Sequence, residues 1–149
     1  MRYLRRYVIE DVNSTQGEYE MFREYQQSTL ANIIFTKELH RRYGGGPNGL
    51  FVCSVHPGCV RTEVTRNMSP LMRWGDFLAA PVLSLLQKTP HEGAYTTIHC
   101  ATSPSLPQEA GAGGAYFFHC RRDAEGAGVG GEDTWRKLWE LSEKMAGLK

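Results

Sequence analysis

Apolar and polar positions in the first third of the chain predict a long helix followed by a buried strand. Thr15-Gln16-Gly17-Glu18 fits a capping box, in which a hydroxyl and a carboxylate satisfy the free amides at a helix start. From about Glu18 to Arg42 the chain is rich in Leu, Ala, Glu and Lys, which favour helix. Residues 50–55 form a nearly continuous apolar run, typical of a strand that is covered on both faces of a parallel sheet. His56-Pro57-Gly58 ends that run.

The second half of the chain predicts a helix, a strand and a closing helix. Thr89-Pro90-His91-Glu92 is a helix start with proline at the first position, and that helix ends before Ser103. Residues 114–118 form a second strand, and residues 121–131 form a Gly/Ala-rich loop. Apolar residues then recur at helical spacing: Trp135, Leu138, Trp139, Leu141 and Met145. Helices alternating with buried strands indicate an α/β layered sheet, but two strands are too few to stand alone.

Composition narrows the class of protein. The chain has 149 residues, of which 41% are apolar and 22% charged, so one globular domain is expected. A formal charge of +1 gives no field that would favour nucleic acid or an anionic membrane. The four cysteines form no Cys-x-x-Cys pair, which indicates reduced thiols in the cytoplasm. No apolar run is long enough to span a membrane, although residues 77–86 could touch a membrane surface.

The chemically most informative pair is Tyr25 and Thr29, one turn apart on the predicted helix. A tyrosine that acts as a proton donor usually needs a cation one helical turn away, and here that position holds a threonine. A helical tyrosine on its own is most often a packing residue. What sets this one apart is its context, Tyr-x-x-Ser-x-Leu-Ala-Asn, which leads into the buried strand and His56-Pro57-Gly58.

With these motifs the chain resembles the short-chain dehydrogenase/reductase family, and within it the retinol dehydrogenase-like branch. The resemblance runs from about residue 10 to the end. It is carried by Tyr25 to Leu39, His56 to Glu63, Lys88-Thr89-Pro90, Glu92-Gly93-Ala94, Gly114 with Tyr116-Phe117, and Leu138 to Ser142. It implies the carboxyl-terminal half of a Rossmann-like, doubly wound parallel sheet, with residues 1–149 as a single partial domain. The amino-terminal dinucleotide-binding half is then expected to be missing.

The resemblance also implies roles for individual residues. Tyr25 matches the family's catalytic acid, which protonates a carbonyl oxygen as hydride arrives from a nicotinamide. Pro57, Gly58, Val60 and Thr62 match the turn that lines the cofactor, which is NADP or NAD in the family. Residues 63–88 match the variable lid over the substrate, and the apolar stretch 68–74 suits a lipophilic carbonyl or alcohol.

Two departures from the family pattern point to a degenerate active site. The family has lysine where this chain has Thr29, which carries no charge and is too short to hold the cofactor ribose. Lys37 lies two turns further on and points elsewhere. The half with the phosphate-binding loop and the catalytic serine is expected to be missing, and we interpret Ser14 as a helix cap and not as that serine. We therefore expect an oxidoreductase homologue that is impaired or inactive, in effect a pseudoenzyme.

Other interpretations compete with this one. A non-catalytic subunit would pair, as a homodimer or within a larger assembly, through the Tyr25 helix and an exposed sheet edge. An upstream half could instead belong to the native protein. Of two Gly-x-Gly-x-x-Gly patterns, the one at residues 44–49 follows a helix and precedes a strand, the reverse of the order that nucleotide binding needs. The one at residues 126–131 follows a strand and precedes a helix, but about seven residues separate it from the strand, Glu132 and Asp133 would repel phosphate, and no second strand follows. The group of Cys53, His56 and Cys59 favours strand-core and strand-end roles over a metal site.

Overall fold

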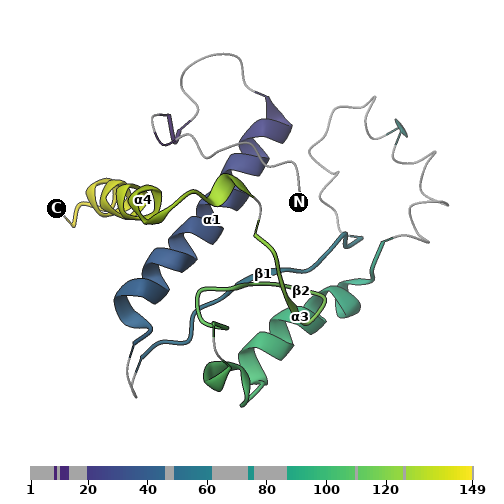
Figure 1. The fold of residues 1–149 in the computed structure, drawn as a ribbon. Helices are drawn as coiled ribbons and strands as arrows, with labels where there is room; N and C mark the ends of the chain where they lie inside the picture. Colours follow the sequence, from purple (N-terminus) through teal and green to yellow (C-terminus); the bar gives the residue numbers. More distant parts are fainter. Residues whose placement is uncertain are drawn as a thin grey trace. The chain divides into compact units, whose positions relative to one another are not determined.

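The computed structural model describes three helices and three short strands joined by loops (Figure 1). The described residues are 9, 11–13, 20–45, 49–61, 74–75, 87–109, 111–125 and 127–148. In chain order the elements are α1 (Met21–Tyr43), β1 (Ser54–His56), α3 (Pro90–Thr102), the 3-10 turn η2 (Leu106–Gln108), β2 (Tyr116–Phe118), β3 (Arg121–Asp123), the 3-10 turn η3 (Ala127–Val129) and α4 (Glu132–Met145).

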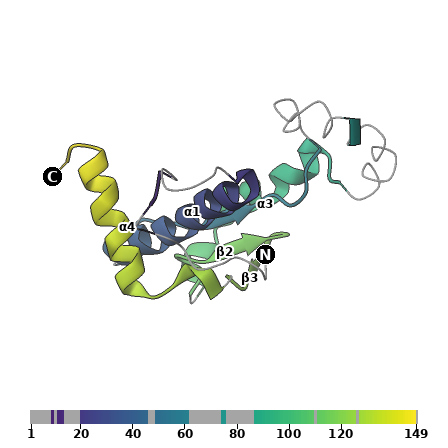
Figure 2. The same cartoon turned by 90° about the horizontal axis from the view of Figure 1, so that it is seen from above.

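The described strands form one mixed sheet in the order β1-β2-β3, which is an incomplete α/β arrangement (Figure 2). The expected α/β class is therefore confirmed. β2 and β3 are joined by only two residues, His119 and Cys120, with φ angles of 52° and 57°. Positive φ at both central residues is what a tight hairpin of type I′ requires.

The chain divides into two compact units, each described here by itself. The first consists of Met1–Ser54, Pro104–Tyr116 and Arg122–Lys149, and the second of Val55–Ser103 and Phe117–Arg121. The prediction of a single partial domain is a statement about the whole chain and stays a prediction.

The core of the first unit is built on one face of α1. Leu30, Ile33, Ile34 and Glu38 are buried, and their spacing follows the helical repeat. Helix α4 packs against α1 (Figure 1), where the indole of Trp139 stacks on the ring of Phe35 at 5.0 Å between centroids. The amphipathic closing helix predicted from its apolar spacing is therefore present, and that apolar face is what holds it to α1.

An ion triad anchors the carboxyl-terminal end of α1. The Glu38 carboxylate is fully buried and accepts two hydrogen bonds from Arg41 and one from Arg42, each at 2.7 Å. The hydrogen bonds from Arg41, reinforced by Arg42, outweigh the opposing effect of burial and lower the pKa of Glu38 to about 2. The guanidinium of Arg42 also lies over the Trp139 ring at 4.8 Å, which ties the triad to α4.

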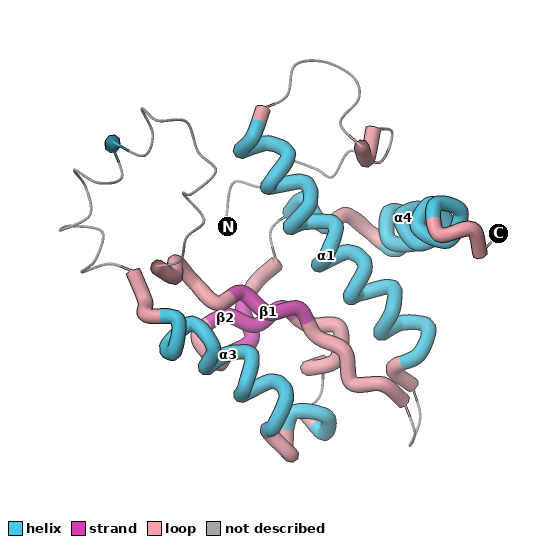
Figure 3. Tube along the Cα trace, turned by 180° about the vertical axis from the view of Figure 1, so that it is seen from behind, coloured by secondary structure: helices cyan, strands magenta, loops and turns pink. Residues whose placement is uncertain are grey.

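The helix of the second unit is α3, which is labelled in Figure 3. The capping box predicted at Thr89 is present: the Glu92 amide donates to the Thr89 hydroxyl, and the Thr89 amide donates to the Glu92 carboxylate. The buried residues of α3 are Gly93, Thr96 and Cys100, again at helical spacing. The Cys120 amide donates to the Thr96 hydroxyl at 3.3 Å, which holds the β2–β3 turn against the helix.

Three expectations differ from the structure. The run at residues 50–55 forms a strand only from Ser54 to His56, and Leu50 is 55% exposed. That run is therefore not covered on both faces within the described sheet. Residues 121–123, expected in a loop, form β3 because the tight turn pairs them with β2. α1 begins at Met21, after a Glu20 that makes no side-chain cap, and the box at residues 15–18 lies outside the described residues, as does Ser14.

Among the described helices, none combines the length and the apolar character that crossing a membrane requires.

Candidate functional site

Tyr25 lies in the second turn of α1, and its side chain is 66% exposed. The helix there is regular, so Thr29 is one turn further along the same face. The Thr29 hydroxyl donates to the backbone carbonyl of Tyr25 at 2.9 Å, and the Ser28 hydroxyl donates to the same oxygen at 2.9 Å. Both hydroxyls are therefore used by the helix backbone, which is a common arrangement for serine and threonine within helices. Thr29 offers no charge to the tyrosine.

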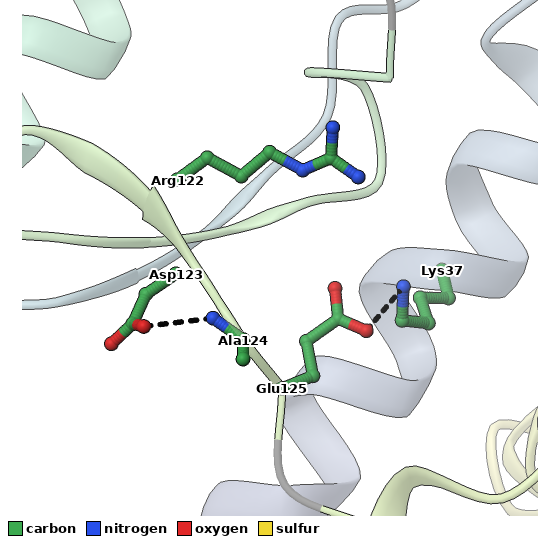
Figure 4. A pocket seen from close by; sticks show the side chains of 5 residues that line it. All are labelled: Lys37, Arg122, Asp123, Ala124 and Glu125. Carbon is green, nitrogen blue, oxygen red and sulfur yellow. Dashed lines mark hydrogen bonds and ion pairs between the residues drawn. The ribbon is translucent and has the colours of Figure 1, made fainter.

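Lys37, the next lysine along α1, has other partners (Figure 4). Its ammonium forms an ion pair with Glu125 at 2.7 Å and donates to the Gly114 carbonyl at 3.4 Å. It also lies 5.2 Å from the centroid of the Trp135 ring. Lys37 stands twelve positions after Tyr25 in the helix, which is about 18 Å along the axis. Lys37 therefore cannot replace the lysine that the family pattern places at residue 29.

A cleft of about 430 Å³ opens beside Lys37 in the first unit (Figure 4). It is lined by Lys37, Arg122, Asp123, Ala124 and Glu125. Its two cations are balanced by two carboxylates, and the Lys37–Glu125 pair neutralises one of each. Nothing in the sequence marked Glu125 as the partner of Lys37, because the two residues lie far apart in the chain. The pair has the character of a structural link between α1 and the segment after β3.

The turn that follows β1 belongs to the second unit and depends on Gly58. This residue has a φ of +93°, in the left-handed region that favours glycine. Its amide donates to Nδ1 of His56 at 2.8 Å, which closes the turn on the last residue of the strand. Pro57 is exposed at the outside of the turn, and Val60 continues it. Thr62, the fourth residue predicted here, lies outside the described residues.

Lys88 holds this turn in place, although sequence reasoning gave it no role of its own. Its backbone forms a parallel bridge with Val60: the Lys88 amide donates to the Cys59 carbonyl at 2.8 Å, and the Arg61 amide donates to the Lys88 carbonyl at 2.9 Å. Its side-chain ammonium donates to the Pro57 carbonyl at 3.3 Å. A Cβ added to Gly58 would lie only 3.2 Å from the Lys88 Nζ. Lys88 therefore fills the space that the glycine leaves.

Two aromatic groups surround the base of the turn. The His56 ring meets the Phe118 ring edge-on at 5.3 Å, and the Lys88 ammonium lies 5.7 Å from the centroid of the same Phe118 ring. Burial lowers the pKa of His56, and the nearby Lys88 cation acts in the same direction. A neutral imidazole agrees with the observed geometry, because its Nδ1 accepts a hydrogen bond from Gly58.

Helix α3 supports the turn from the other side of Val60. A Cβ added to Gly93 would come within 2.6 Å of a Val60 methyl carbon, so only glycine allows this close approach. The same helix starts at the capped Thr89, immediately after Lys88. Lys88 and Gly93, one from each of the Lys88-Thr89-Pro90 and Glu92-Gly93 motifs, therefore both contact Val60, while Thr89 and Glu92 cap the helix between them.

The turn combines a left-handed glycine, an exposed proline and the ammonium of Lys88. The described residues include no group of three His, Cys, Asp or Glu side chains placed to hold a metal ion. Tyr25 and Thr29 lie in the first unit, and the turn that begins at Pro57 lies in the second.

Comparisons with known proteins identify relatives of the chain. No family model matches it. It is 40% identical to mouse retinol dehydrogenase 14 over 145 residues, which is 94% of this chain and 40% of that protein. It is 38% identical to human retinol dehydrogenase 11, covering 91% of the chain and 40% of the relative. It is 34% identical to the human WW domain-containing oxidoreductase, covering 90% of the chain and 30% of that protein.

The chain thus spans about two fifths of the length of the retinol dehydrogenases it matches. That share fits the expectation that it corresponds to their carboxyl-terminal half. These relatives are oxidoreductases of one family, and the match covers nearly all of this chain. The chain belongs to the retinol dehydrogenase-like branch of the short-chain dehydrogenase/reductase family.

Proposed function

We propose that this chain carries the tyrosine and the cofactor-lining turn of an NAD(P)-dependent oxidoreductase of alcohols and carbonyls, with impaired activity. The observation that supports impaired activity is the hydrogen bond from the Thr29 hydroxyl to the Tyr25 carbonyl. The side chain that should supply a cation is uncharged, and its hydroxyl is already used by the helix. Lys37, the next cation along α1, is engaged by Glu125.

In this proposal Tyr25 is the general acid. Its side chain is exposed, and its phenolic hydroxyl would donate a proton to the carbonyl oxygen of a bound substrate. A cation next to an acid eases loss of its proton, typically by roughly 1 to 3 pKa units. Without that cation the tyrosine gives up its proton less readily, and turnover falls.

The second part of the site is the cofactor turn. Pro57, Gly58, Val60 and Thr62 would line the nicotinamide end of NADP or NAD. When bound, that cofactor would supply or accept the hydride. The residues of this chain would hold it: Gly58 by allowing the left-handed backbone of the turn, over which the Lys88 stem packs, and Val60 by anchoring the turn to Lys88. The names of the relatives favour a lipophilic alcohol or aldehyde as substrate, and a cytoplasmic chain that touches membrane surfaces would meet such molecules.

The test is to restore the missing charge. The unsubstituted chain, Thr29→Lys and the double variant Thr29→Lys/Tyr25→Phe are titrated with NADPH and NADH by fluorescence. Each is then assayed for reduction of retinal. We expect little turnover from the unsubstituted chain and a rise of about tenfold or more in Thr29→Lys, the size of effect that a neighbouring cation has. The double variant should lose that gain.

Two results would contradict the proposal. Efficient turnover by the unsubstituted chain would show that the active site is not impaired. A gain in Thr29→Lys that persists without the tyrosine hydroxyl would show that Tyr25 is not the acid. Circular dichroism of all three proteins would check that the helix is intact, which is expected because Thr29 is not part of the buried face of α1.

A second candidate function is supported by the exposed apolar side chains of α1. Phe22 and Tyr25 are 65% and 66% exposed and lie one turn apart on the same face. Two such aromatic groups on one helix face could pack against the same helix of a second copy of this chain, which would make it a homodimeric interaction subunit. Size-exclusion chromatography with light scattering tests this. A monomer at high concentration, or a dimer unchanged by Phe22→Ser, would count against it.

A further inference from the structure

We propose that Lys88 is a positioning residue for the cofactor-lining turn, held there by its bond to the Pro57 carbonyl and its packing against Gly58 and Phe118. The inference rests on the proposed function as far as the cofactor is concerned. We call the contacts of Lys88 with Pro57, Gly58 and Phe118 the brace. These residues all belong to the second unit, so the brace is argued from the geometry of that unit alone. No role of this kind follows from spacing in the sequence, because Lys88 and Pro57 are 31 residues apart.

The first step of the argument is how many separate contacts converge on Lys88. Its backbone pairs with Cys59 and Arg61 on both sides of Val60. Its ammonium reaches back to the Pro57 carbonyl at 3.3 Å. One residue therefore binds the turn by main chain at one end and by side chain at the other.

The second step concerns the shape of the turn. Gly58 is in the left-handed region, and its missing Cβ is replaced by the Lys88 side chain: Nζ, Cε and Cδ would lie 3.2 to 3.4 Å from a Cβ placed there. The lysine stem therefore packs over the glycine and limits how far the backbone can move. Without the stem, the left-handed conformation would lose its main side-chain neighbour.

The third step concerns charge. The Lys88 ammonium lies over the Phe118 ring and has three N–H donors, of which Pro57 accepts one. A cation on the face of an aromatic ring is stabilised there without being neutralised. The Lys88 ammonium therefore lies beside the turn, where an acceptor or anionic group of a bound dinucleotide would meet it.

The experiment compares Lys88→Met, which removes the charge and keeps most of the stem, with Lys88→Arg, which keeps the charge. Lys137→Met on the exposed face of α4 is the matched control. Hydrogen exchange is followed by mass spectrometry in peptides that contain the amides of Gly58 and Arg61. We expect exchange about tenfold faster in Lys88→Met, the effect of losing one hydrogen bond to a charged donor. Lys88→Arg should recover most of the protection, and Lys137→Met should change nothing.

A second readout separates positioning from general loosening. Burial lowers the pKa of His56, and the Lys88 cation and the neighbouring His119 act in the same direction. An NMR titration of the His56 imidazole should therefore show a higher pKa in Lys88→Met and no rise in Lys88→Arg. If Lys88→Met does not fold, Lys88→Gln takes its place, since the backbone bridge to Val60 needs no side chain.

The outcomes distinguish this inference from the proposed function. Faster exchange at the turn and a raised His56 pKa support the brace, even where the unsubstituted chain binds no nucleotide and the proposed function fails. If the chain does bind NADPH, the dissociation constant should rise in Lys88→Met and recover in Lys88→Arg. Unchanged exchange in Lys88→Met, or no recovery with arginine, would overturn the inference.

Discussion

Replacing Glu38 with glutamine should destabilise the chain at neutral pH far more than a surface substitution does. The carboxylate is fully buried and accepts three hydrogen bonds from Arg41 and Arg42. Those partners lower its pKa from 4.5 to about 2, which corresponds to about 3 kcal/mol of stabilisation by the ionised form. Arg41 is 42% exposed, so solvent screening reduces the expected loss to about 2 kcal/mol.

The pH dependence gives this prediction its sign. A carboxylate with a lowered pKa contributes fully above its unfolded value of 4.5, and the contribution disappears as pH falls toward about 2. Urea unfolding followed by tryptophan emission measures this, because Trp139 lies against Arg42. Glu38→Gln should be less stable by about 2 kcal/mol at pH 7, and the difference should shrink between pH 4.5 and pH 2. The control Glu140→Gln on α4 should stay within about 0.5 kcal/mol. A difference that is absent at pH 7, or that is the same at pH 3, would refute the reasoning.

Two further substitutions test the second unit. Gly58→Ala puts a methyl group on a residue in the left-handed region and against Lys88. The free energy of unfolding, measured by thermal denaturation, should therefore fall by about 1 to 2 kcal/mol. An unchanged melting temperature would mean that the turn can adopt another conformation. Thr89→Ala removes the capping hydroxyl that accepts a hydrogen bond from the Glu92 amide, and the free energy of unfolding should fall by about 1 kcal/mol. Thr89→Ser should recover most of it, and failure to do so would remove the cap as the cause.

The features that the sequence predicted well are those decided by neighbouring residues. The Thr89 capping box connects residues three apart, so its sequence pattern and its hydrogen bonds coincide. The apolar face of α4 is likewise visible in the spacing of its own residues, and Leu138 is indeed buried. Here local chemistry and tertiary packing favour the same structure.

What the sequence did not predict depends on contacts between distant segments. Arg121-Arg122-Asp123 is exposed and polar throughout, so no alternation marks it as a strand. It becomes β3 only because His119 and Cys120 adopt a left-handed turn without the glycine or asparagine that usually signals one. The role of Lys88 was hidden for the same reason, since its partner Pro57 lies in another segment.

The residue at position 29 bears on the proposed catalysis and not on the packing of α1. Its hydroxyl is satisfied by the Tyr25 carbonyl, and the buried face of α1 runs through Leu30 and Ile34. Threonine in place of lysine therefore leaves helix packing unchanged. Lysine also has the higher helix propensity of the two, so restoring it should not cost stability. The packing of α1 therefore does not depend on which of these two residues stands at position 29. If Thr29→Lys restores turnover without altering the unfolding curve, the chain has lost a charge and kept the scaffold that once positioned it.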